Sequence, residues 1–452
     1  MKTTMNRLLC PLCLALCFAA SLHAEEAPKF IELQGHTDGV SYALSSPDGK
    51  KVLVFGGLVS VYDAESGKEL YKLVDSVSGA KFSPNGKIIA THTQRYLQLW
   101  DAETGKELHK IDLDSPFCHD FSPKGNKIYA RNYSGTGYRI WDVESGKELE
   151  YQGWHPFFSP DGTKMIDADF SRKTILVRDV DSWKILHTLE HAPWIRQSLF
   201  SPDGKKIITV NGGTVRIWTL QPTLTFIEFK IEIKEDRNEY IFANFSSDGK
   251  KICVNAGRMH FERGFVSRIS VWDVESGKEL YKLNEDNVST ADFSPDGKVI
   301  ATFKRDVGAH IWDAESGKEL RKIELPDNFS FFEYFLPDGK KIAATNHTFR
   351  IYRIWDIESG EELNFNGGLP VWSPDGAKLV SAIHGAEEPS NIVPVYDTDS
   401  WEVLHELKHE HPVWSAHFSP DGKKIITVGD DGVRIWTLPT PPAEPPSEKG
   451  EK

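Results

Sequence analysis

Residues 293–318 read FSPDGKVIATFKRDVGAHIWDAESGK, and this stretch contains the elements of a unit that recurs along the chain. Ser-Pro-Asp-Gly at residues 294–297 predicts a type I turn, because proline presets φ and glycine relieves the exit from the turn. Turns of this type recur about 40 residues apart, which is the spacing of a repeat protein. The ten copies carry the glycines Gly49, Gly86, Gly125, Gly162, Gly204, Gly249, Gly297, Gly339, Gly376 and Gly422. Each copy therefore marks a β-hairpin.

The residues around each turn predict four short strands. An aromatic residue precedes the turn in nine of the ten copies, as Phe293 does, and is expected to end the first strand. Runs such as 205–210 and 215–218 have strand length and composition and predict the second and third strands. The polar segment Asp313–Lys318 then predicts a turn into a fourth strand at 319–323. Four antiparallel strands per unit make one propeller blade, so we predict an all-β propeller of ten four-stranded blades.

Tryptophan-aspartate pairs give these units a family resemblance. The pairs, each preceded by an aliphatic residue, are Trp100-Asp101, Trp141-Asp142, Trp272-Asp273, Trp312-Asp313 and Trp355-Asp356. They resemble the WD-repeat family over residues 29 to 438. The departures are Tyr62, Arg178 and Tyr396 in place of tryptophan, and Thr219 and Thr437 in place of aspartate. The Gly-His pair typical of the family occurs only at Gly35-His36, so the resemblance implies a histidine network in few of the blades. Propellers of translocation proteins and prolyl-peptidase caps share the Ser-Pro-Asp-Gly turn and are the competing assignment.

The repeats are themselves duplicated, with halves at about 25–222 and 223–438. The segment 433–438 repeats 215–220, and Asp399-Ser400-Trp401 repeats Asp181-Ser182-Trp183. Two architectures fit this pattern: one ring of ten blades, or two five-bladed rings in series. Residues 29–33 resemble a fourth strand without a blade of its own, and they could complete the last unit, which would close one ring and remove its open edges. The expected strand at 226–231 continues the fifth unit. We prefer one ring.

Both ends of the chain differ from the repeats. Residues 1–24 have the form of a secretory signal peptide: Lys2 and Arg7, an apolar stretch from Leu8 to Leu22, and Ala24 before two glutamates. That stretch is too short to span a bilayer, and we expect no membrane-spanning helix elsewhere. We therefore predict a periplasmic or secreted protein cleaved near Ala24. The tail at 439–452 is rich in Pro, Glu and Lys and is expected to be disordered.

Charge and cysteine content exclude several classes of partner and cofactor. Loss of Lys2 and Arg7 with the signal peptide takes the formal charge from −13 to −15. An acidic protein lacks the basic surface of a nucleic-acid binder, so we expect no DNA or RNA partner. Cys118 and Cys253 remain after cleavage and lie in different repeats, which supports neither a disulfide framework nor a zinc cluster. We predict no cofactor.

Comparison of the ten copies suggests a binding surface. The turns before the second strand and after the third strand stay nearly constant, whereas the loops on the other face vary in length and content. Two of these loops are long, 256–268 and 384–391. Variable loops on a rigid scaffold are typical of binding surfaces, and neutral drift is the alternative explanation. The candidate partner-binding residues are Arg258, His260, Phe261, Arg263, His384, Glu387 and Glu388.

The sequence offers little support for catalysis or metal binding. It contains neither a Gly-x-Ser-x-Gly elbow nor an Asp-x-Asp-x-Asp-Gly calcium loop. His405, His409, His411 and His417 lie close together, but Pro412 interrupts the segment, and we favour a structural role between blades over a metal site. We predict a noncatalytic scaffold that binds a protein or peptide through the variable face. The alternatives are an envelope hydrolase or lyase with its site in the central channel, and a structural spacer tethered by its tail.

Overall fold

The computed structural model describes residues 27–439 except for 34–38, 76, 114–115, 133–136, 152–155, 169–173, 192–194, 232–238, 261–263, 284, 286–287, 289, 305–307, 327–328, 347–351, 364, 366–367 and 383–389. Within these described residues the chain forms 39 strands and no helix. No helix able to cross a membrane is therefore found in this part of the chain. The strands form ten antiparallel sheets, nine with four strands and one with three. The all-β prediction is confirmed.

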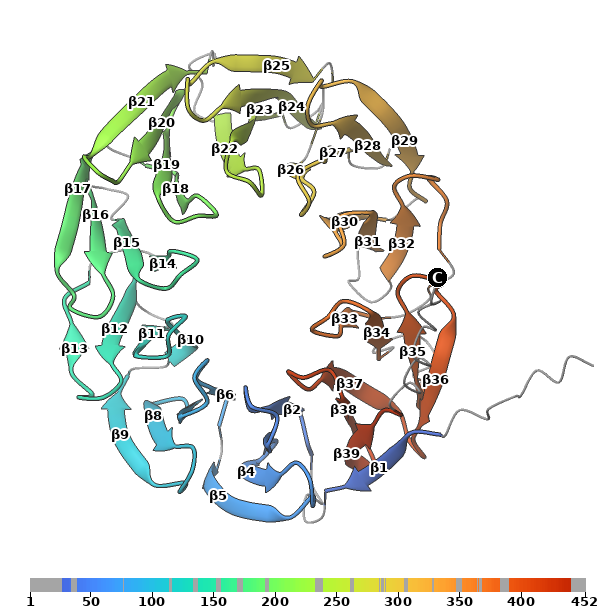
Figure 1. Ribbon diagram of the computed structural model, residues 1–452. Helices are drawn as coiled ribbons and strands as arrows, with labels where there is room; N and C mark the ends of the chain where they lie inside the picture. The colour runs from blue at the N-terminus through green and yellow to red at the C-terminus, as the bar shows by residue number, and fades with distance from the viewer. Residues whose placement is uncertain are drawn as a thin grey trace, which may run out of the picture.

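The sheets follow one another along the chain, and each runs outward from a first strand near the centre of the ring (Figure 1). In the first half they comprise β2–β5 (Tyr42–Ser45, Lys51–Phe55, Leu58–Asp63, Glu69–Asp75), β6–β9 (Gly79–Phe82, Ile88–His92, Tyr96–Asp101, Glu107–Asp112), β10–β13 (Pro116–Phe121, Lys127–Asn132, Tyr138–Asp142, Glu148–Leu149), β14–β17 (Phe157–Phe158, Lys164–Ala168, Thr174–Asp179, Ile185–Glu190) and β18–β21 (Gln197–Phe200, Lys206–Asn211, Thr214–Thr219, Thr225–Lys230). In the second half they comprise β22–β25 (Glu239–Phe245, Lys251–His260, Gly264–Asp273, Glu279–Leu283), β26–β29 (Thr290–Phe293, Val299–Lys304, Gly308–Asp313, Glu319–Glu324), β30–β32 (Phe329–Phe335, Lys341–Asn346, Tyr352–Asp356), β33–β36 (Pro370–Trp372, Lys378–Ser381, Ile392–Asp397, Val403–Lys408) and β37–β39 (Val413–Phe418, Lys424–Gly429, Gly432–Thr437).

The amino-terminal strand β1 (Lys29–Glu32) completes the last sheet, as expected from the sequence. It pairs antiparallel with β39, with Phe30 opposite Trp436, in the sheet order β1-β39-β38-β37. The two ends of the fold thus lie side by side (Figure 1). The centre of the Phe30 ring lies 4.6 Å from that of the Trp436 ring. The Arg434 guanidinium also contacts Phe30, 4.6 Å from the centre of its ring. The ring is closed by a strand from the opposite end of the chain.

Adjacent sheets are joined by apolar packing and by a recurring ion pair. Val52 and Tyr62 of the first sheet share a buried cluster with Ile426 and Val433 of the last, and the fifth and sixth sheets share a similar cluster around Ile217. A lysine that begins the second strand meets a glutamate from the next sheet. Such pairs are Lys51–Glu103 at 2.5 Å, Lys206–Glu275 at 3.0 Å and Lys424–Glu65 at 2.8 Å. The junction between the duplicated halves and the closing junction therefore resemble an ordinary junction, which makes one ring.

The antiparallel strands divide the ring into two ends. The backbone N–H of Ala64, after the third strand, donates to the carbonyl of Lys50, which precedes the second strand, at 2.8 Å. The Ser-Pro-Asp-Gly turns and the turns after the third strand therefore share one end, which we call the turn end. The connections between second and third strands lie at the other end, which we call the hairpin end.

The eighth unit departs from the expected four strands. Among the described residues its sheet contains only β30, β31 and β32, and a single bridge between Trp355 and Glu362 stands where a fourth strand would begin. The sequence here runs into Gly367-Gly368, and glycine weakens a strand because it provides no side chain for packing. The fourth strand of the third unit, β13, is likewise only two residues long. In both units, the outer strand beside which the next blade would lie is short or, among the described residues, not formed.

Closure can be tested with a matched pair of phenylalanines. Phe226 of β21 lies 4.7 Å from Trp218, with Arg216 at 4.8 Å, so its surroundings duplicate those of Phe30. Each aromatic contact contributes about 1 kcal/mol. We expect Phe30→Ala to raise hydrogen exchange in β1 and β39 on the order of tenfold, because only pairing and side-chain contacts join β1 to β39, whereas β21 follows its partner β20 directly in the chain. Phe226→Ala should leave exchange in β21 nearly unchanged. Equal exchange in both variants would contradict closure by β1.

Candidate functional site

Among the strands that the structure describes, β23 and β24 form the longest hairpin at the hairpin end. Both strands are ten residues long, compared with six in β27 and β28. They pair continuously from Lys251 opposite Asp273 to His260 opposite Gly264. The prediction of a loop at 256–268 is therefore wrong, since Ala256 pairs with Arg268. Alternating residues in this segment satisfy a ladder of backbone hydrogen bonds, and the glycines at its tip concealed that pattern in the sequence.

The structure places only part of the predicted partner-binding set. The backbones of Arg258 and His260 lie near the tip of β23, where Arg258 pairs with Val266 and also with Glu239 of β22. Phe261 and Arg263 lie outside the described residues, as do all candidates from the 384–391 loop, His384, Glu387 and Glu388. That these seven residues form one partner-binding surface therefore stays a prediction.

The base of this hairpin is fixed to the following sheet. The buried Ser267 hydroxyl donates to the carbonyl of Val288 at 2.7 Å and accepts from the N–H of Val288 at 2.9 Å. Both Ser267 and Val288 are fully buried. This pair of bonds connects β24 to the segment that leads into β26, so a rigid base supports the part of the hairpin that extends beyond its neighbours.

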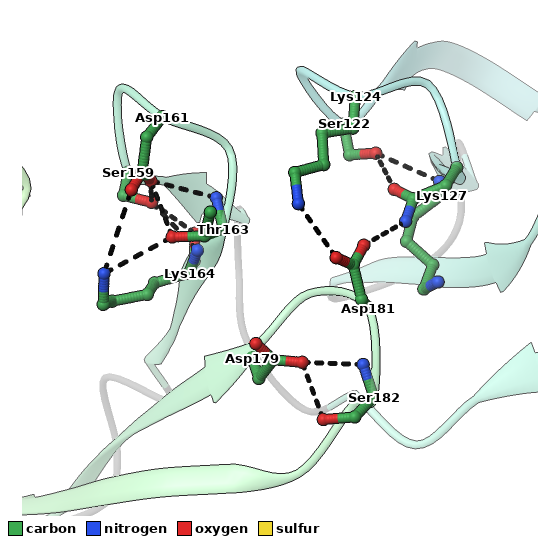
Figure 2. Close-up of polar contacts among 11 residues, drawn as sticks. Ser122, Lys124, Lys127, Ser159, Asp161, Thr163, Lys164, Asp179, Asp181 and Ser182 are labelled. Atoms are coloured by element: carbon green, nitrogen blue, oxygen red, sulfur yellow. Dashed lines mark hydrogen bonds and ion pairs between the residues drawn. The ribbon is translucent and has the colours of Figure 1, made fainter.

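The recurring serine and aspartate side chains of the turn end are engaged in structural hydrogen bonds. In the fourth unit, the Ser159 hydroxyl donates to Asp161 at 2.6 Å, and the Thr163 N–H donates to the same carboxylate at 3.0 Å (Figure 2). These bonds lower the pKa of Asp161 to about 2. After the third strand, Asp179 accepts from the Ser182 N–H at 2.7 Å and from its hydroxyl at 2.6 Å. These groups hold turns together, which explains their repetition without catalysis.

A second carboxylate in that turn connects neighbouring sheets. Asp181 accepts from the Lys124 ammonium of the preceding unit at 2.8 Å (Figure 2). It also accepts from the Asn126 amide of that unit at 2.6 Å. It occupies the position that Glu65 and Glu103 hold in other units. Side chains at the turn end thus connect neighbouring sheets.

Tryptophans of the third strand anchor a buried polar network whose other partners change between units. The indole N–H of Trp100, Trp218, Trp312 and Trp436 donates to a second-strand threonine, at 2.8 to 2.9 Å. In the last unit His409 extends the network, because its Nε2 meets Thr427 and its Nδ1 meets Asp431, both at 2.7 Å. In the seventh unit Glu285 takes the corresponding place beside Thr302. The expectation from the Gly-His pair missed His409, which is preceded by a lysine.

Of the other clustered histidines, His417 lies at an inter-sheet contact. His417 packs edge-on against Tyr42 of the first sheet, with ring centres 4.8 Å apart. In the second and third units, His92 and His119 share a buried Nδ1–Nδ1 hydrogen bond of 2.8 Å. No group of three or more metal-ligating side chains is found in the described part of the chain. Because both ring nitrogens of His409 are already engaged, that side chain serves structure.

Two tryptophans replace glycine where the preceding sheet has no full fourth strand within the described residues. In most units the turn after the third strand ends in a glycine at positive φ; at Gly105 a Cβ would lie 2.6 Å from the Tyr71 ring of the preceding sheet. In the fourth and ninth units the same position is Trp183 (φ 61°) and Trp401 (φ 59°). These follow the units with the two-residue β13 and the missing fourth strand. The indole of Trp401, 8% exposed, packs against Phe365 and Tyr396 and fills that place.

A closed ring of radial antiparallel sheets, with a strand from one terminus completing the sheet of the other, defines a β-propeller. A family model described as "Outer membrane protein assembly factor BamB" matches residues 55–323, and one described as "WD domain, G-beta repeat" matches residues 401–437. The chain belongs to the first family, whose model spans more than half of its length, and its repeats and curated relatives make it a WD-repeat propeller protein. The resemblance seen in the sequence is confirmed.

Individual relatives share parts of the chain. WD repeat-containing protein SL1-17 of Schistosoma mansoni is 28% identical over 223 residues, covering 39% of this chain and 74% of that protein. A WD repeat-containing protein WDS homolog of Arabidopsis thaliana is 29% identical over 175 residues, covering 36% of this chain and 33% of the relative. The crystal structure of a eukaryotic initiation factor superposes with a TM-score of 0.51 and 18% identity, covering 75% of this chain and 91% of that one. At that identity the likeness shows the fold alone.

The glycine-to-tryptophan exchange predicts a stability change. Trp401→Gly should lower the free energy of unfolding by about 2 kcal/mol, because loss of the packed indole outweighs relief of the positive φ. Trp401→Asn should lower it similarly, since asparagine tolerates the backbone conformation but cannot fill the space. Urea unfolding measures both variants. A Trp401→Gly protein as stable as the parent would show that strain dominates this position.

The buried histidines predict acid sensitivity. Burial, with a contribution from His92, lowers the pKa of His119 from 6.5 to about 3, and burial also lowers the pKa of His92, His409 and His417. The unfolded chain therefore takes up protons first as the pH falls, and stability present above pH 6.5 is lost below it. Each such histidine contributes a slope of up to about 1.4 kcal/mol per pH unit.

Urea unfolding at pH 7 and pH 5 measures this slope. We expect His119→Asn to reduce it, and His411→Gln, at an exposed position, to leave it unchanged. An identical slope in the parent and the His119→Asn variant would rule out the assigned role of His119.

Proposed function

We propose that the protein is an exported, noncatalytic scaffold that binds a protein or peptide partner at the hairpin end of its propeller. The β23–β24 hairpin carries this proposal. Its two ten-residue strands extend further than neighbouring hairpins, and Ser267 fixes their base. A rigid, protruding hairpin loses little conformational freedom on binding, which favours its use as a recognition element.

The turn end supports the noncatalytic part of the proposal. Its repeated Ser and Asp groups are held in hydrogen bonds such as those around Asp161 and Asp179. A carboxylate whose pKa is lowered by turn hydrogen bonds, as that of Asp161 is, is a weak general base for the hydroxyl that donates to it. The same groups recur around the ring, as expected for a structural role.

Export is supported by the position of the closing strand. β1 begins at Lys29, so cleavage near Ala24 would leave the whole strand in the mature chain. The family description "Outer membrane protein assembly factor BamB" also names a factor in the assembly of outer membrane proteins. Both observations agree with a scaffold acting outside the cytoplasm.

The experiment compares capture of envelope proteins by the mature chain and by a hairpin-trimmed variant. The variant replaces residues 258–266 with Asn-Gly, which forms a two-residue turn between paired strands. It retains the Gly257–Ser267 pair and therefore the contacts of Ser267 with Val288. We expect a partner captured by the mature chain to be lost with the trimmed variant at an unchanged melting temperature.

Two controls distinguish the alternatives. Glu103→Ala alters an exposed ion pair at the turn end and should retain the partner, since such pairs contribute little stability. Removal of residues 440–452 should also retain it. Capture that survives trimming but is lost with the tail would favour a tethered spacer, and capture of no specific protein would overturn the proposal.

A further inference from the structure

An open cavity of about 310 Å³ lies at the inner edge of the ring, where three consecutive sheets meet. Phe245 of β22, Phe293 of β26 and Phe335 of β30 line it, and all three strands face the centre of the ring (Figure 1). Phe303 of β27 also lines it. Because Ser294 and Pro295 contribute to its wall, the cavity belongs to the turn end. It is therefore remote from the hairpin tip.

One carboxylate, Asp292, stands in this aromatic wall. Its Oδ1 accepts from the Asn244 amide of the preceding sheet at 2.6 Å. Among the described residues no cationic side chain forms an ion pair with it. Burial raises the pKa of Asp292. By contrast, the bond from Ser419 lowers the pKa of Asp421, a turn aspartate. Asp292 is thus a partly buried acid without a counter-charge.

The corresponding position in another unit shows what is missing. Asp120, which like Asp292 precedes the aromatic residue of the first strand, pairs with the Lys81 ammonium of the preceding sheet at 2.9 Å. In the sixth unit that lysine is replaced by Asn244, which satisfies one oxygen but supplies no charge. A cation delivered from outside would complete the pair.

The aromatic side chains favour a cation with an apolar stem. Phenylalanine faces attract ammonium and guanidinium groups, and this attraction strengthens where water is excluded. Phe242 lies two residues before Asn244 on β22 and is 55% exposed, which adds apolar surface on the same strand. The volume is at the lower limit of small-molecule sites and suits a group the size of a side chain.

We propose that this cavity binds an organic cation, an ammonium or guanidinium group on a short apolar stem, with Asp292 as its counter-ion and the phenylalanines as its walls. The proposal does not depend on partner binding at the hairpin end, because the hairpin-trimmed variant leaves every lining residue in place. The cation can arrive as a free amine or as a lysine or arginine side chain.

The test measures dissociation constants of n-butylammonium and its neutral analogue n-butanol by ligand-observed NMR. We expect the mature protein to bind the ammonium at least tenfold more tightly than the alcohol. Asp292→Asn should weaken ammonium binding about tenfold and leave butanol binding unchanged, since it keeps the shape and removes the charge. Asp120→Asn, at the matched position without this cavity, should bind both probes as the parent does.

Acidification gives a second readout. Protonation of Asp292 removes its charge, so affinity for the ammonium should fall with pH whereas affinity for butanol stays constant. N-acetyl-lysine methylamide distinguishes the sources: binding indicates a side-chain ligand, and its exclusion alongside bound butylammonium indicates a free amine. Equal affinity for ammonium and alcohol, or unaltered ammonium binding by a folded Asp292→Asn protein, would overturn the proposal.

Discussion

Every blade of this protein is apolar on both faces, so the fold depends on giving each sheet two neighbours. Val52 and Tyr62 of the first sheet are fully buried only because the last sheet packs against them. An open row of sheets would leave such faces exposed at both ends, at a cost of about 25 cal/mol for each Å² of apolar surface. Closure avoids that cost. Pairing of β1 with β39 joins the segment that leads into the first sheet to the last sheet, and so holds the two sheets together.

The duplicated halves contain the same phenylalanine–tryptophan contact at two places in the ring. Phe226 packs on Trp218 within a continuous blade, and Phe30 packs on Trp436 across the closure, with nearly equal ring distances of 4.7 and 4.6 Å. These two outer strands pair without the bulge found in strands such as β9, where register shifts between Leu99 and Trp100. The units concerned have Thr219 and Thr437 instead of the aspartate that starts the usual turn. A fourth strand without the bulge does not need the usual turn that leads into it. It can therefore come from another part of the chain, as β1 does.

The sequence predicted the strands, their turns and the closing strand because each depends on local patterns repeated many times. Proline and glycine fixed the turns, and alternation fixed the strands. The β23–β24 hairpin escaped prediction, because glycines at 257 and 264 resemble loop residues and only pairing between the strands shows otherwise. The sequence indicated a structural role for His409 but not its hydrogen-bond network, because its partners Thr427 and Asp431 are 18 and 22 residues away. The Asp292 cavity needs three sheets side by side, and no single repeat contains it.

Repetition also explains why a distinctive site arises where copies differ. Lys81 and Asp120 both stand before the aromatic residue of a first strand, and their charges neutralise each other across the junction between two sheets. This ion pair has a structural role. The change to Asn244 beside Asp292 preserves the hydrogen bond and removes the positive charge. A partly buried carboxylate is tolerated here because the Asn244 amide satisfies one of its oxygens, whereas an unpaired lysine would lack any acceptor. Asparagine in place of lysine at one position of a repeat can thus leave a carboxylate without its ion-pair partner, while the strands around it keep the same fold.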